Sequence, residues 1–236
     1  MRRIIATSLA AGLMLGACQS ITTVEGFDAA ASRGEVVRID GRGVGQSGRF
    51  VIAPLGTAGI FKRSAQSRTV NGDKLAIGDL AFSLMGGEFD GLSAECAHSR
   101  ETFEISEQVS RRTTVGASYL TGPYVLTCGF YRDGEPLGGI AMHEEVGGSI
   151  GTARSGGGEV GPVRMRVTSL HSSPGLAIPS GSPLGYAMDF EDGGEAVLFA
   201  NGFDRRVALP RTGRDERAAA LLSGIVLSLV WDPGDD

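Results

Sequence analysis

The C-terminal segment 218–231 constrains the fold more than any other stretch of this chain. It reads AAALLSGIVLSLVW, and two serines and one glycine are its only interruptions. Its 14 residues are too few to cross a bilayer as a helix, which takes about 20. A helix that is apolar on every face has to be surrounded by protein. We therefore predict a buried core helix over 215–231, ended by Pro233.

Most of the remaining chain has the pattern of strands joined by tight turns. Asn-Gly and Asp-Gly pairs are strong hairpin signals, because both central residues of a type I′ turn have positive φ. The stretches GYAMDFE, EAVLFA and FDRRVALP are separated by two such turns and predict a β-meander. The pairs are Asn71-Gly72, Asp90-Gly91, Asp133-Gly134, Asp192-Gly193 and Asn201-Gly202.

Two of these hairpins share an aromatic-x-Asp-Gly turn, at Tyr131–Gly134 and Phe190–Gly193. A weak internal repeat of about 60 residues and shared turn chemistry both account for the likeness. Between the hairpins, residues 147–162 read GGSIGTARSGGGEVGP and predict a long, mobile, glycine-rich loop.

The first 17 residues have the organisation of a secretory signal peptide. Arg2 and Arg3 precede a short apolar region, and the segment closes on small residues. The ending Leu15-Gly16-Ala17-Cys18 resembles the bacterial lipobox, which implies cleavage before Cys18 and acylation of its thiol. An ordinary secretory signal cut after Ala17 is the alternative.

Residue 19 is Gln and not Asp, and the resemblance then implies sorting to the outer membrane. We expect a lipidated N-terminus and flexible tether over 18–34, followed by one β-rich domain over 35–233. The anchored protein is expected at the periplasmic face of the outer membrane, held there by its acyl chains.

Two cysteines, Cys96 and Cys128, remain after Cys18. In an oxidising periplasm such a pair most simply forms a disulfide. A zinc site built from both cysteines with His98 and His143 is the alternative, but the spacing matches no recognised ligand pattern. We predict the disulfide.

A β-rich domain that ends in a helix buried on all sides resembles the tubby C-terminal-like superfamily, with its phospholipid scramblases and LURP-one-related proteins. The matching stretches are CGFYRDGEPLGGI, YAMDFEDGGEAVL, GFDRRVALP and ERAAALLSGIVLSLVWDP. The resemblance implies one antiparallel β-barrel wrapped around the C-terminal helix. It carries over no functional residue. After the signal-like segment the only paired arginines are Arg111-Arg112 and Arg205-Arg206, and the scramblases' calcium segment has no counterpart.

Three motifs suggest chemistry that their surroundings do not support. GVGQSG (43–48) fits the dinucleotide fingerprint, but a strand-like stretch follows where that motif requires a helix. GGSIG (147–151), with Ser149, fits a hydrolase elbow but lacks the strand–helix context. His143-Glu144-Glu145 lacks the second histidine of a zincin. Glu144 with Asp189 or Asp192 would supply paired carboxylates for glycoside chemistry, although sequence spacing does not set their separation in space. The scattered His98, His143 and His171 suggest no metal site.

The formal net charge of −5 gives no electrostatic footprint for nucleic acid. We expect a non-enzymatic module that binds an envelope protein or lipid, uses no cofactor or metal, and binds on its rim loops or outer face. The alternative is a carrier of a lipophilic ligand in an open barrel, with the apolar segment outside or as a lid. A hydrolase ranks last.

Overall fold

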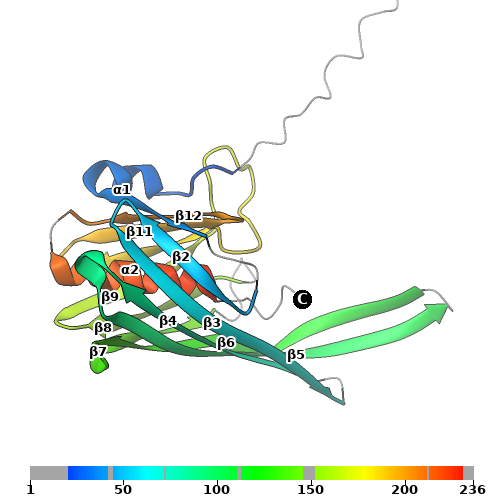
Figure 1. Cartoon of the computed structure of the whole chain (residues 1–236). Coiled ribbons are helices and arrows are strands. Elements are labelled where there is room, and N and C mark those ends of the chain that lie inside the picture. The colour runs from blue at the N-terminus through cyan, green and yellow to red at the C-terminus, as the bar shows by residue number, and fades with distance from the viewer. Residues whose placement is uncertain are drawn as a thin grey trace, which may run out of the picture.

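The computed structural model describes residues 21–41, 45–71, 73–110, 113–145, 152–211 and 213–230. They form a closed barrel of twelve antiparallel strands wrapped around a C-terminal helix (Figure 1). Each strand pairs with its neighbours in the sequence, and β1 closes the ring on β12. The predicted fold class, a mainly β barrel with a buried C-terminal helix, is therefore confirmed.

The strands differ in length, and two of them extend far beyond the barrel wall. Beyond Phe103, β5 pairs with β6 alone, and the two form an arm that projects from the barrel (Figure 1). The strands are β1 (Glu35–Asp40), β2 (Ser47–Ala53), β3 (Thr57–Val70), β4 (Asp73–Met85), β5 (Leu92–Ser110), β6 (Thr113–Arg132), β7 (Glu135–Glu144), β8 (Arg154–Val160), β9 (Val163–Leu170), β10 (Gly185–Phe190), β11 (Glu195–Asn201) and β12 (Asp204–Leu209).

Helix α2 (Arg214–Leu229) occupies the barrel interior. It contacts β5 and each of the strands from β8 to β12. Its residues from Arg217 to Val226 are all buried, so the apolar sequence is matched by apolar partners on every side. The helix ends at Leu229, two residues before the predicted end. Among the described residues, no helix is both long and apolar enough to span a membrane.

Arg217 fixes the start of α2 to the barrel wall. Its guanidinium donates to Glu35 at 2.8 Å and to Glu88 at 2.6 Å, in β1 and in the 3-10 helix η1 (Gly87–Phe89). Burial disfavours the charged form of Arg217, but the hydrogen bonds and negative charges of Glu88 and Glu35 outweigh it and raise its pKa above the usual value. The apolar helix thus begins on a paired charge.

The predicted turns lie where strands reverse. Asp133 and Gly134 have φ of 52° and 84°, the positive values of a type I′ turn, between β6 and β7. The Asp192-Gly193 and Asn201-Gly202 pairs join β10 to β11 and β11 to β12, which confirms the meander. Asp90-Gly91 follows η1, and Gly72 of the fifth pair lies outside the described residues.

The glycine-rich loop predicted over 147–162 is wrong for its second half, which is strand β8 and the turn after it. β8 pairs with β7 and β9 along its whole length. A Cβ on Gly156 would lie 2.1 Å from the Ala141 carbonyl oxygen, and one on Gly158 would lie 1.9 Å from that of Gly139. These glycines therefore permit a close approach of two strands. Residues 146–151 lie outside the described residues.

The flexible tether predicted over 18–34 is wrong from residue 21 onward, because this segment packs on the outer barrel wall. Helix α1 (Phe27–Arg33) lies over β11 and β12, and the ring centroids of Phe27 and Phe199 are 6.2 Å apart. Val24, Phe27 and Ala30 share one face at helical spacing and are buried. The sequence shows this period in a segment too short for us to expect a helix. Residues 18–20 lie outside the described residues.

The predicted disulfide is confirmed, because Cys96 and Cys128 are directly opposite on β5 and β6 with an S–S distance of 2.15 Å. The bridge spans a sequence separation of 32, so chain entropy predicts a stabilisation of about 3 to 4 kcal/mol. The zinc alternative is wrong, because the bridge uses both thiolates. The described residues contain no group of three or more side chains able to hold a metal ion.

Removing apolar volume from α2 should destabilise the whole barrel. We expect Leu222→Ala to lower the free energy of unfolding by about 2 to 5 kcal/mol, because Leu222 is fully buried inside the barrel. Leu75→Ala removes the same atoms from a side chain that is 41% exposed and should cost less than about 1 kcal/mol. Urea denaturation followed by circular dichroism measures both. Equal losses would mean that α2 is not the core of the fold.

Candidate binding site at the polar mouth of the barrel

The inner wall of the barrel changes character along its axis. Near the start of α2 it is apolar, with Phe130, Ile140 and Phe190 buried. Near the end of α2 the inward side chains are polar and charged. We call this end the mouth, and define it by Arg63, His98, Arg100, Tyr124, Glu144, Arg154, Ser169, Tyr186 and Arg205.

Arg63 holds the C-terminal end of α2. Its Nη1 donates to the Leu229 carbonyl oxygen at 2.7 Å, and its Nε donates to the Gly45 carbonyl oxygen at 3.1 Å. Carbonyls in the last turn of a helix lack helical partners and carry a partial negative charge. Arg63 therefore satisfies a helix end that would otherwise be buried at a cost.

Arg100 and Glu144 form a buried ion pair across the mouth. Arg100 Nη2 donates to Glu144 Oε1 at 2.6 Å, and the carboxylate also accepts from the Tyr124 backbone N–H at 3.3 Å. The Glu144 side chain has no exposed surface, and the Arg100 side chain is 14% exposed. The opposite charges of Arg100 and Glu144 therefore offset one another within this pair.

Arg154, at the start of β8, is a buried arginine of the mouth and is 6% exposed. Its guanidinium carbon is 4.0 Å from the centroid of the Tyr124 ring, and its Nη1 donates to the Tyr186 hydroxyl at 3.4 Å. Both contacts hold the planar guanidinium in one orientation, as arginine stacked on an aromatic ring allows.

A chain of hydrogen bonds connects Arg154 to the loop between β9 and β10. The Arg154 backbone N–H donates to Ser169 Oγ at 2.8 Å, and that hydroxyl is 3.0 Å from His171 Nε2. His171 Nδ1 is 2.9 Å from the Ser180 carbonyl oxygen. Ser169 and His171 are both buried, and Ser169 is absent from the lining of the hollow described next. We therefore assign this series of hydrogen bonds a structural role: it holds the loop between β9 and β10 in place.

Above Arg154 the mouth contains a hollow of about 640 Å³. Polar side chains and apolar side chains share its wall, and α2 supplies its floor. It is lined by Ile21, Tyr124, Arg154, Ser180, Ser182, Pro183, Leu184, Tyr186, Ala200, Asn201, Gly202, Phe203, Arg205, Leu227, Ser228 and Val230.

The described side chains that define the mouth are rich in arginine. Among the described side chains that define it, four arginines face one carboxylate, that of Glu144. The end of α2 adds a partial negative charge of about half an elementary charge. Because the site is partly shielded from water, the positive charge acts on a bound group more strongly than it would at an open surface. The arrangement suits an anion.

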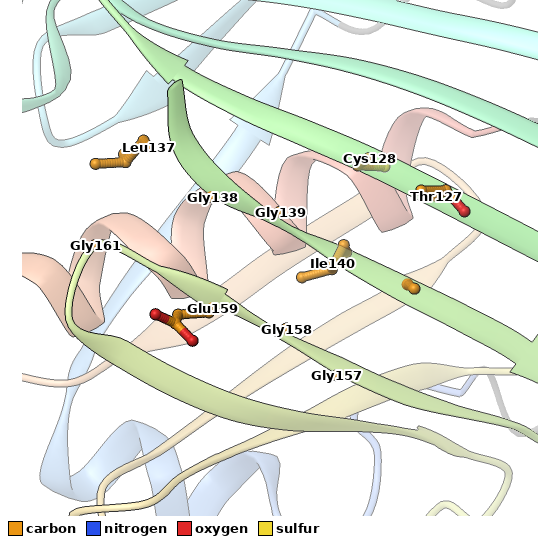
Figure 2. A pocket seen from close by; sticks show the side chains of 11 residues that line it. Thr127, Cys128, Leu137, Gly138, Gly139, Ile140, Gly157, Gly158, Glu159 and Gly161 are labelled. Atoms are coloured by element: carbon orange, nitrogen blue, oxygen red, sulfur yellow. The ribbon is translucent and has the colours of Figure 1, made fainter. Parts of the chain in front are cut away.

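A second depression of about 410 Å³ lies on the wall over β6, β7 and β8 (Figure 2). Glycines 138, 139, 157, 158 and 161 make much of its lining, and Glu159 is the charged side chain among the residues that line it. The depression exists because glycines have no side chains. It gathers no set of groups that would recognise a ligand, so we favour the mouth.

The structure separates most of the other residues that the sequence singled out. His98 is buried at the mouth, His143 is exposed on the outer wall, and His171 is in the β9–β10 loop. Glu144 faces inward whereas Asp189 and Asp192 are exposed, so Glu144 forms a carboxylate pair with neither of them. Gly48 lies within strand β2, which excludes the helix that a dinucleotide site requires.

Other predicted residues fall outside the described part of the chain. These are Cys18, Gly43, Ser149 with its flanking glycines, and the Arg111-Arg112 pair. The remaining basic pair divides, because Arg205 lines the hollow whereas Arg206 stacks on Phe27 and Phe199 outside.

Sequence reasoning missed Arg63, Arg100 and Arg154 of the mouth, and it noted Arg205 only as part of a basic pair with Arg206. The four arginines of the mouth lie on four different strands, so no local motif contains two of them. A usable signal was their alternation: Arg63, Arg154 and Arg205 share the inward parity of Phe61, Val160 and Val207 on their own strands. A charge at an inward position of an otherwise apolar strand marks a candidate site.

Comparison with known families, curated proteins and solved structures found no match for this chain.

The Arg100–Glu144 pair should prove strongly coupled. We expect Glu144→Gln to lower the free energy of unfolding by about 3 kcal/mol, because it leaves a buried guanidinium without its carboxylate. The double variant Arg100→Gln/Glu144→Gln should lose less than the sum of the single losses. Urea denaturation of the four proteins measures the coupling energy.

The exposed pair Arg164–Glu159, with its 3.1 Å separation, is the matched control. The same cycle there should give a coupling below about 1 kcal/mol. Additive losses at Arg100 and Glu144 would contradict the buried ion pair.

Proposed function

We propose that this chain is a lipoprotein of the bacterial outer membrane, anchored through Cys18, and that it serves as a non-enzymatic binding module at the periplasmic face. The signal-like first 17 residues and the lipobox-like ending support the anchor. The binding site we propose is the mouth, and its ligand is an anion attached to an apolar body.

One observation carries the choice of site: a hollow of about 640 Å³ lies over buried Arg154 and beside Arg205. Guanidinium groups bind carboxylate and phosphate oxygens through paired hydrogen bonds, which makes them strong and directional anion ligands. Ser180, Ser182 and Asn201 add polar groups at the rim, while Leu184 and Val230 provide apolar surface. This mixture matches a ligand with an acidic head and an apolar body.

The structure does not have the open barrel of the carrier alternative. α2 lies inside a closed barrel, and its buried residues meet strands on every side. A lipocalin-like ligand would need the space that the helix occupies. The filled interior supports a binding site at the mouth, on the rim side of the helix, and not along the barrel axis.

The anion requirement is testable with simple probes. Decanoate should bind the protein with one site per chain, and decanol, which lacks the charge, should bind at least tenfold more weakly. We expect Arg205→Gln to weaken decanoate binding by about tenfold or more, because one charged hydrogen bond is worth about 1.5 to 3 kcal/mol. Isothermal titration calorimetry measures each affinity.

Arg164→Gln is the control, because it removes the same charge from an exposed position on the outer wall. It should leave decanoate binding unchanged. Equal binding of decanoate and decanol, or equal losses in the two variants, would contradict an anion site at the mouth. Binding of inorganic phosphate with the affinity of decanoate would show that the apolar body is not recognised.

The anchor is tested separately in a bacterial host supplied with labelled palmitate. The full-length chain should take up label and fractionate with the outer membrane, whereas Cys18→Ser should do neither. Label in the Cys18→Ser variant, or an unlabelled wild type, would contradict acylation at this cysteine. This result is independent of the outcome at the mouth.

A further inference from the structure

One sector of the mouth presents apolar side chains directly to solvent. Phe203, in the turn between β11 and β12, is 79% exposed, and Ile178, in the loop between β9 and β10, is 78% exposed. Large apolar residues on the outer barrel wall are covered far better, as Ile60 at 45% shows. We call Phe203, Ile178 and the two connections that carry them the apolar rim. Phe203 lines the hollow together with Ser180 and Ser182 of the loop that carries Ile178, so both exposed side chains belong to the same end of the barrel.

The loop that presents Ile178 is held by hydrogen bonds at both ends. The Leu176 N–H donates to the Ser173 carbonyl oxygen at 3.0 Å, and the Ser180 N–H donates to that of His171 at 2.8 Å. The Thr152 hydroxyl donates to the Gly181 carbonyl oxygen. The exposed position of Ile178 is therefore set by the loop backbone.

The N-terminal segment 21–25 contacts the barrel at this same rim. Asn201 Nδ2 donates to the Ile21 carbonyl oxygen at 3.2 Å, and Ser173 Oγ donates to that of Thr23 at 2.7 Å. The Glu25 N–H donates to the Ser172 carbonyl oxygen at 3.0 Å. In Figure 1 the blue start of the chain lies beside the yellow β9–β10 loop. Both connections of the rim thus hydrogen-bond to residues 21–25, the segment that follows the proposed anchor.

The distance from the anchor to the rim is short. Cys18 precedes Ile21 by three residues, and an extended chain spans at most about 3.6 Å per residue. The Cα atoms of Cys18 and Ile21 are therefore no more than about 11 Å apart. Ile21 and Phe203 both line the hollow of the mouth. An acyl anchor on Cys18 consequently brings its membrane to the apolar rim.

We infer that the apolar rim docks on the membrane in which Cys18 is anchored, with Phe203 and Ile178 inserted among the lipid headgroups. The inference rests on the acylation of Cys18 proposed above. Acyl chains and a second, weaker contact together fix an orientation that acyl chains alone leave open. The hollow then opens beside the lipid surface, so acidic amphiphiles reach Arg205 from the bilayer.

The projecting arm leaves the barrel at the mouth end as well, but from the wall opposite the rim. In the ring of strands, β5 and β6 lie on the opposite side from β11, separated from it by several strands in either direction. A bilayer that touches the rim on the side of β9 to β12 therefore lies across the barrel from the arm. The docked face also includes the neighbourhood of α1, which covers β11 and β12.

Tryptophan fluorescence of the acylated protein in phosphatidylcholine vesicles tests the contact. Trp231 is the single tryptophan of the sequence, so Trp231→Phe provides a silent background. Into it we would place Phe203→Trp and, as control, Ile60→Trp on the outer wall. Lipids brominated on their acyl chains quench by contact. The tryptophan at position 203 should lose most of its emission and shift to the blue, whereas the one at position 60 should respond only to iodide in the water.

Iodide quenching at position 203 equal to that at position 60, in protein whose N-terminal peptide carries acyl mass, would overturn the docking alone. Missing acyl mass would overturn the proposed anchor, and with it this inference. Shielding of position 203 without vesicles, accompanied by a dimer in sedimentation, would assign the rim to a second copy of the chain and overturn the membrane contact. In the Trp231→Phe/Phe203→Trp background, Ile178→Ser should increase iodide quenching of the tryptophan at position 203 in the vesicle-bound protein, whereas Ile60→Ser should not.

Discussion

The burial of α2 within the barrel is the constraint on which the rest of the structure depends. A ring of twelve strands encloses more space than its own inward side chains fill, and an unfilled interior forfeits both packing and hydrophobic stabilisation. The helix supplies the missing core, and its fully buried leucines contact strands on several sides. Gly224 shows how tight the fit is, because a Cβ there would lie 2.9 Å from Val207 Cγ2. Burial of the apolar helix is therefore the interaction that decides the fold, and the strands form the barrel that encloses the helix.

A helix inside a barrel has two ends, and each poses a different electrostatic problem. At its start, Asp215 and Glu216 suit the partial positive charge of the first turn, while Arg217 pairs with two carboxylates. At its end, the carbonyls need donors, and Arg63 supplies them. Arg154 and Arg205 line the hollow beside this helix end, and for this reason we interpret the mouth as a site and not only as a cap.

The sequence was most informative where a pattern reports on a single physical requirement. The segment 218–231, apolar on every face, predicted a helix surrounded by protein, and Asp133-Gly134 predicted a tight hairpin turn. Both predictions were confirmed. The prediction failed at β8, because its inward glycines are chosen for close contact with a neighbouring strand, and that contact is invisible in one dimension. It failed again at α1, where the apolar period of Val24, Phe27 and Ala30 spans too few residues to stand out. The mouth was missed because its charges converge only after the ring closes. The suggested superfamily and the acylation of Cys18 stay predictions.

The location of the N-terminal segment connects the anchor, the rim and the hollow in one argument. A tether of the length first expected, 18–34, would let the barrel tumble far from its membrane and would make the position of the mouth irrelevant to lipid. Instead α1 and residues 21–25 are bound to the wall, so little chain is left between Cys18 and the folded domain. If Cys18 is acylated as proposed, the fold converts that point of attachment into an orientation. Because Ile21 itself lines the hollow, the same few residues that would set the distance to the membrane also form part of the proposed binding site. A ligand that enters from the lipid surface would contact apolar side chains first and the arginines afterwards. An amphiphile that leaves a bilayer would thus replace its lipid contacts with apolar protein contacts before its acidic head reaches a guanidinium.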